Sequence, residues 1–267
     1  MLTRRKYIVP LALALFTASA SADDLVYVTT FIGQFGAIDI TTGAFQQIGP
    51  TTSDPLGGLV VGPAGYLGIS ISGNLDSVNP ATGVISVIGA TGLGYSALDT
   101  AELDGRVYAT DSTNNLYRVD TATGVASLIG PTGIPPAPTN PSYLYDESLF
   151  AAGGKLYATF DAFNATTTPC TLVVYPELYQ INPRTGVASL VGPTAFQINA
   201  AVDLRGTVYA FTAGGAELPS GQTCTVGGTD QVLTLDLATG DTTFMSNYDP
   251  ATFFVTGAAR RLHRQGD

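Results

Sequence analysis

The chain has 267 residues and a formal net charge of −10, because 21 Asp and Glu stand against 11 Lys and Arg. Only 12% of the residues are charged and 45% are hydrophobic, which excludes a charge-rich disordered chain and a coiled coil. The acidic balance disfavours a nucleic-acid partner, and one His with two Cys argues against a zinc site or a His-based catalytic triad.

The first 22 residues have the pattern of an export signal. Three basic residues, Arg4 to Lys6, precede an apolar run from Tyr7 to Phe16, and Ala20-Ser21-Ala22 matches a small-residue cleavage site. This run is too short to span a bilayer, so we expect an exported chain, periplasmic or extracellular, without a membrane span. Arg4 and Arg5 leave the twin-arginine route open beside the general secretory one.

One nine-residue phrase recurs five times after this leader. Each copy has an apolar alternation, then Asp or Asn, and ends in Thr-Gly; the copies occupy residues 35–43, 75–83, 116–124, 178–186 and 232–240. The period-two alternation suits a half-buried strand. The Asp or Asn side chain accepts amide hydrogen bonds in a turn, and Gly supplies the positive φ that closes it. The phrase therefore predicts five β-hairpins.

Further strands are expected before each hairpin. One set lies at residues 25–30, 66–70, 106–111, 155–160 and 207–211, and leading strands lie at 58–61, 97–103, 148–152 and 199–204. The hairpin glycines are 40, 41, 62 and 54 residues apart, and about 40 residues per four-stranded unit is the period of a β-propeller blade. Insertions at 133–141, 161–175 and 212–230 account for the longer spacings.

The first unit lacks a leading strand, and the missing strand is expected at the other end of the chain. Phe253–Ala259 resembles the leading strands, but no hairpin follows it. The sequence therefore predicts an all-β, five-bladed β-propeller of four-stranded antiparallel blades, closed by a C-terminal strand that joins the N-terminal blade. The expected domain covers residues 23–259, followed by a polar tail over 260–267. A six-bladed ring with a degenerate blade in 133–148 and a β-sandwich are the alternatives.

Export changes the interpretation of the two cysteines. Cys170 lies in the insertion at 161–175 and Cys224 in the insertion at 212–230, which occupy the same place in successive blades. In an oxidising compartment the sequence favours a disulfide between them, which would hold the two insertions together. The alternative is two buried free thiols, because spacing alone does not show that the two Cβ atoms meet.

Two repeated segments resemble a known group of proteins. Tyr27–Thr30 and Val107–Asp111, the latter followed by Leu116–Asp120 and its Thr-Gly turn, are similar to the YVTN-type and related bacterial secreted propellers. The resemblance covers nearly the whole mature chain and implies the propeller fold. These families include lactonases and sugar- and peptide-binding surface proteins, so the resemblance implies no single function.

Polar residues of the leading strands are the first candidates for a site. When these strands are aligned on the Gly that follows each of them, Glu147 and Asn199 share one position and Asp99 comes one residue later. Oxygen-bearing side chains from three blades have the chemistry that calcium prefers. The alternative is that they hydrogen-bond exposed backbone or solvate the channel mouth. The sequence leaves calcium open and indicates no other cofactor.

Four tyrosines outside the repeated strand position are candidates for a ligand-binding face. They are Tyr95, Tyr143, Tyr145 and Tyr175, in loops or at strand starts. Exposed tyrosines with acidic neighbours bind sugars or peptides, and the alternative is packing between blades.

The first functional hypothesis is a non-enzymatic binding or scaffolding module, monomeric, whose ligand is a small molecule, a glycan or a protein. The second is a metal-dependent hydrolase or lactonase with a calcium-type site in the central channel. An enzyme needs a general base, and the only histidine, His263, lies in the polar tail.

Overall fold

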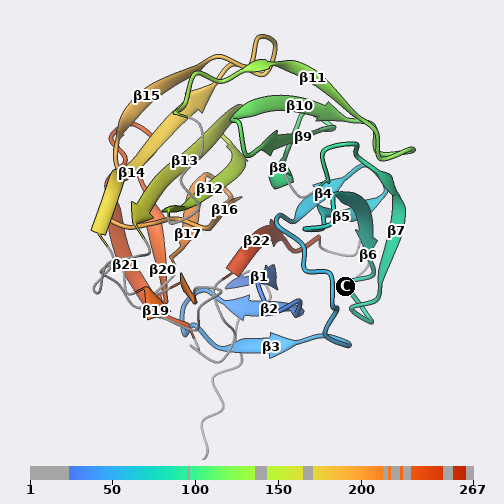
Figure 1. Cartoon of the computed structure of the whole chain (residues 1–267). Helices are drawn as coiled ribbons and strands as arrows, with labels where there is room; N and C mark the ends of the chain where they lie inside the picture. The colour runs from blue at the N-terminus through green and yellow to red at the C-terminus, as the bar shows by residue number, and fades with distance from the viewer. Residues whose placement is uncertain are drawn as a thin grey trace, which may run out of the picture.

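The computed structural model describes residues 24–94, 97–135, 143–164, 171–212, 216–217, 223–224, 230–248 and 255–262. These residues form five four-stranded antiparallel sheets arranged as blades around a central axis (Figure 1). Within this part of the chain, no helix is long and apolar enough to cross a membrane.

Four blades are built from consecutive segments of the chain. The second contains β4 (Val60–Gly62), β5 (Gly65–Ile69), β6 (Asn74–Val78) and β7 (Ile85–Ala90); the third β8 (Ala97–Leu103), β9 (Arg106–Asp111), β10 (Asn115–Val119) and β11 (Ala126–Pro131). The fourth contains β12 (Tyr143–Ala152), β13 (Lys155–Asn164), β14 (Thr171–Ile181) and β15 (Ala188–Pro193); the fifth β16 (Ala200–Leu204), β17 (Thr207–Phe211), β20 (Gln231–Leu235) and β21 (Thr242–Asn247). A separate hairpin joins β18 (Ala216–Glu217) to β19 (Thr223–Cys224).

The first blade closes the ring. Its order is β22 (Val255–Arg260), β1 (Leu25–Thr30), β2 (Phe35–Asp39) and β3 (Phe45–Gln47), so the last strand of the chain pairs with the first (Figure 1). The five-bladed ring and its closure are therefore confirmed, and the six-bladed and sandwich alternatives are not realised. Half of the insertion predicted at 161–175 turns out to be strand, because β13 and β14 continue into it as one long hairpin.

The core is divided among the five interfaces between neighbouring blades. Each interface buries one hydrophobic cluster; Val26 and Val28 of the first blade, for example, pack with Phe211 and Val232 of the fifth. The alternation of each strand sends one set of side chains to the preceding blade and the other set to the following blade. In the fourth blade, Leu149 packs toward the third blade while Phe150 packs toward the fifth.

The Thr-Gly turns join each blade to the one before it. The turn begins with an Asp or Asn side chain, as in Asp120, whose Oδ1 accepts a hydrogen bond from Ala122 N over 2.8 Å. Its glycine then lies against a second glycine on the outer strand of the preceding blade; the pairs are Gly83 with Gly49, Gly124 with Gly89, Gly186 with Gly130 and Gly240 with Gly192. A Cβ on either member would enter the backbone of the neighbouring blade. Close backbone approach thus explains the second recurring glycine.

The fifth junction differs from the other four, because no second glycine faces its turn. Here Gly43 of the first blade lies against the backbone of Asn247, and the hydroxyl of Ser246 donates a hydrogen bond to Ile40 O over 2.8 Å. A side-chain contact therefore joins the two blades where the ring closes.

Candidate functional site

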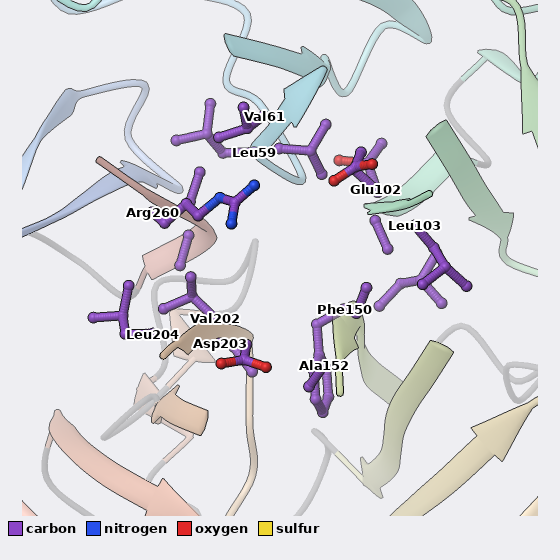
Figure 2. A pocket seen from close by; sticks show the side chains of 18 of the residues that line it. Leu59, Val61, Glu102, Leu103, Phe150, Ala152, Val202, Asp203, Leu204 and Arg260 are labelled. Carbon is purple, nitrogen blue, oxygen red and sulfur yellow. The ribbon is translucent and has the colours of Figure 1, made fainter. Parts of the chain in front are cut away.

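The ends of the five leading strands surround a cavity of about 800 Å³ on the ring axis. Its lining comes from β4, β8, β12, β16 and β22, so all five blades contribute (Figure 2). The second strand of each blade starts just beyond this end of the channel, after a tight turn such as the one at Gly105. The cavity is therefore framed by the ends of the innermost strands of all five blades.

Apolar and polar groups share the cavity wall. Figure 2 shows Leu59, just before β4, Val61 from β4, Leu103 from β8, Phe150 from β12, and Val202 and Leu204 from β16 around the opening. The volume lies within the usual range of small-molecule sites.

Three acidic residues, Glu102, Asp104 and Asp203, line the cavity, and backbone amides fix two of their carboxylates at the rim. Glu102 Oε1 accepts a hydrogen bond from Gly105 N over 2.6 Å. Asp203 accepts one from Gly206 N over 2.7 Å, and its second oxygen accepts one from Gly153 N of the neighbouring blade over 3.1 Å. These bonds hold both side chains at the edge of the cavity, where Figure 2 shows their oxygens.

The segment that ends β22 brings basic side chains to the same cavity. The hydroxyl of Tyr66 donates a hydrogen bond to Arg260 O over 3.2 Å and accepts one from Leu262 N over 2.7 Å. Burial raises the pKa of the Tyr66 hydroxyl, so it stays a neutral donor at physiological pH. Arg261 lies 5.8 Å from the ring centroid of Tyr27, within cation–π range. The backbone of this segment is thus fixed by the second blade.

The predicted calcium ligands lie at the opposite end of the channel from this cavity. Asp99, Glu147 and Asn199 are all buried; Asp99 lies near the start of β8, Glu147 in the middle of β12, and Asn199 just before β16. Asp99 accepts a hydrogen bond from Thr100 N over 2.5 Å and another from Leu149 N of the neighbouring blade over 2.8 Å. Its first oxygen also occupies the space that a Cβ on Gly58 would need. Asp99 thereby links three blades.

Asp99 is engaged in hydrogen bonds between blades, and a metal held by Asp99, Glu147 and Asn199 stays a prediction. Both oxygens of Asp99 already accept backbone amides, and the described residues contain no group of three or more His, Cys, Asp or Glu that could hold a metal ion. Calcium in proteins takes six to eight oxygen ligands, usually with several carboxylates.

The other predicted site residues lie partly outside the described structure. Tyr175 is 72% exposed on β14, in the extended part of the fourth blade. Tyr143 and Tyr145 pair through their backbones with Asn164 and Ala162 in the same extension, at the far end from the cavity. Tyr95 lies outside the described residues.

The disulfide stays a prediction. Cys170 falls outside the described residues, and only the backbone of Cys224 is described, paired with Ala216 in the small hairpin of the fifth blade. The two cysteines do belong to insertions of the fourth and fifth blades, as expected.

Acidic side chains dominate the end of the channel that holds Asp99. Burial opposes ionisation of Asp111, but hydrogen bonds from Asn115 N, Thr113 and Tyr117 outweigh it and hold the Asp111 pKa below its usual value. The equivalent position in the second blade is Ser70, and the equivalent of Tyr117 is Asp76. The second blade therefore carries its carboxylate, Asp76, on β6, whereas the third blade carries its carboxylate, Asp111, on β9.

Asp76 is expected to make the protein less stable as the pH rises from 4 to 7. Burial and the nearby charge of Asp54 raise its pKa to about 6, although the Ser70 hydroxyl opposes this. Because the folded form holds the proton more tightly than the unfolded form, stability falls between the unfolded pKa of about 4 and the folded value. Asp76→Asn should therefore stabilise the protein by about 1–3 kcal/mol at pH 7.5 and have little effect at pH 4. Thermal unfolding of both proteins across this range measures the difference; a gain independent of pH would contradict the assignment.

Sequence analysis did not find the cavity residues. Arg260 was assigned to the polar tail, whereas β22 extends to it, and Glu102 was not singled out. One signal for these residues was present in the sequence. Glu102 and Asp203 occupy the same position, just before the turns that follow two leading strands, and Arg260 ends a third leading strand.

Comparisons with known proteins support the fold alone. No family model and no curated protein matches the chain, so the similarity to YVTN-type propellers is not confirmed at the level of a family. A solved structure of a protein of unknown function from Bacteroides thetaiotaomicron is 16% identical with a TM-score of 0.51, and the match covers 82% of this chain and 54% of that one. The chain thus spans about half the length of that protein.

A second solved structure is the PQQ-bound aldose sugar dehydrogenase of Streptomyces coelicolor, at 14% identity and a TM-score of 0.45, covering 72% of this chain and 77% of that one. Identities this low carry no functional information. The five blades and their closure place the chain in the class of β-propellers, with a cavity at one end of the channel.

Proposed function

We propose that the chain is an exported, non-enzymatic binding module that takes a small molecule in the cavity at the ends of its leading strands. The observation that carries this proposal is the cavity itself, about 800 Å³ in volume and lined by all five blades. A cavity framed by paired strands, with apolar side chains and charged groups in its wall, suits recognition of a small molecule. The rim carboxylates Glu102 and Asp203 bond to turn amides, which suits a positioning role.

The test of this proposal combines a ligand screen with a variant that fills the cavity. Val61 is half-buried in the cavity wall, and Val61→Trp narrows the opening. Val87→Trp is the matched control, because Val87 is 65% exposed on an outer strand away from the cavity. A compound that raises the melting temperature of the wild type should do so for Val87→Trp but not for Val61→Trp. Equal shifts in both variants would place the ligand elsewhere.

A calcium-dependent hydrolase is the second candidate, and one observation keeps it testable. The hydroxyls of Thr100 and Ser148, adjacent to Asp99 and Glu147 in sequence, are buried without a hydrogen-bond partner among the described residues. Buried polar atoms normally find a partner in protein, water or an ion.

Thermal unfolding with EDTA and with millimolar calcium separates the two candidates. We expect equal melting temperatures in both conditions, because Asp99 is engaged with amides of two blades. A rise of several degrees with calcium, lost in the double variant Asp99→Asn/Glu147→Gln, would instead place a cation in the channel and favour the hydrolase.

A further inference from the structure

We infer that the ligand of the cavity is a small monoanion with an apolar body, whose charged group binds the guanidinium of Arg260. This inference rests on the proposed function, because it requires the cavity to be the ligand site. Three observations support it: the distribution of basic residues, the orientation of Arg260, and the two carboxylates on the rim.

Basic residues concentrate at this cavity in a chain that is otherwise acidic. Only eight of the 11 Lys and Arg lie after the leader, and three of them, Arg205, Arg260 and Arg261, line the cavity. The opposite end of the channel carries buried acidic residues, among them Asp76, Asp99 and Asp111. The same cavity is also lined by Glu102, Asp104 and Asp203, so the attraction for an anion is local to the arginine side chains.

Arg260 is exposed and has a side chain directed at the cavity. Its backbone is fixed by pairing with Val26 and by the bond from Tyr66 to its carbonyl. Figure 2 shows its guanidinium pointing toward the centre of the opening. Among the described residues it makes no hydrogen bond or ion pair, whereas Arg261 stacks on Tyr27. A guanidinium offers a planar set of donors that matches a carboxylate or sulfonate, so the ligand supplies the missing acceptor.

The rim and wall limit what else the ligand carries. Glu102 and Asp203 face the same opening as Arg260, so a second negative charge on the ligand would be repelled (Figure 2). The apolar side chains of Leu103, Phe150 and Val202 lie opposite and beside the arginine. One anionic group and an apolar body satisfy both conditions, and the cavity volume accommodates a body of about ten carbon atoms.

Calorimetric titration of the mature chain with decanoate, below its critical micelle concentration, tests the inference. Decanol is the neutral probe of the same length and decylammonium the cationic one. We expect decanoate to bind most tightly, and Arg260→Gln to weaken its binding tenfold or more through loss of a charge-assisted pair. Arg260→Lys should restore part of the loss. Arg184→Gln is the matched control, because Arg184 lies in an exposed outer turn away from the cavity, and it should leave the affinity unchanged.

The outcomes distinguish this inference from the proposed function. If decanol binds as tightly as decanoate, and Val61→Trp but not Arg260→Gln abolishes binding of both, the cavity is a ligand site but the anion assignment is wrong. Tighter binding of decylammonium would assign recognition to Glu102 and Asp203 and overturn the inference. If none of the three probes binds the wild type, the inference fails and the cavity loses its support as a site for amphipathic molecules.

Discussion

Replacing Gly124 by alanine is expected to destabilise the protein by at least about 3 kcal/mol. Gly124 has a φ of +85°, where an alanine is strained by about 1 kcal/mol. The added Cβ would also lie 2.5 Å from the carbonyl oxygen of Gly89 in the preceding blade. The added Cβ is fixed to one backbone, and the Gly89 oxygen belongs to another. The contact is therefore relieved only if the two blades separate, and separation costs packing along the whole interface.

Gly105→Ala is the matched control for this experiment. Gly105 has a similar φ of +75°, but nothing lies within 4 Å of the Cβ that alanine would add. The free energy of unfolding of Gly105→Ala should therefore fall only by the cost of the strained backbone conformation, about 1 kcal/mol. Denaturant unfolding of the wild type and both variants measures the difference. Equal losses in the two variants would show that the contact between blades adds nothing, and the explanation of the recurring glycine would be wrong.

The sequence predicted the blades because each depends on local signals. The phrase around Asp120 contains its own strand, its Asx turn and its positive-φ glycine. The hairpin can therefore be predicted without knowing which segment packs against it. Ring closure was predictable for a similar reason, since Leu25–Thr30 lacks a strand before it and Phe253–Ala259 lacks a hairpin after it. The role of Gly89 was not predictable, because its partner belongs to the next blade and only the packing brings them together.

The candidate site was predicted less well, for reasons of the same kind. Aligning strands found Asp99 and Glu147, which are indeed buried at one end of the channel. The cavity lies at the other end, and its distinguishing residue, Arg260, comes from the strand whose position depends on closure of the ring. In the sequence, Arg260 belongs to a run of basic residues, a pattern that is typical of a solvated tail. Its direction into the cavity follows from the pairing of β22 with β1.

Removing β22 is expected to abolish the cooperative folded state. A chain that ends after Tyr248 loses Val255, which is fully buried, together with Ala258 and Ala259 and the backbone pairing to β1. The first blade then lacks its innermost strand, and the fifth blade lacks the side chains of β22 that pack against it (Figure 1). The loss should exceed about 5 kcal/mol, comparable with the whole stability of a typical domain, and the exposed edge of β1 invites aggregation.

A synthetic peptide of residues 249–262 provides the complementary test. Because β22 has no covalent link to β1 within the first blade, the peptide should pair with the truncated chain, restore a thermal transition in a saturable manner and rebuild the cavity with its arginine. A peptide with Gly257→Val is the control: a Cβ at Gly257 would meet the backbone of Leu59 and Gly58, so this peptide should not restore folding. A truncated chain that melts like the full-length protein would contradict the closure of the ring by β22. Restoration by the peptide would show instead that the strand acts through its pairing and packing, and would allow substitutions at Arg260 to be compared within one folded ring.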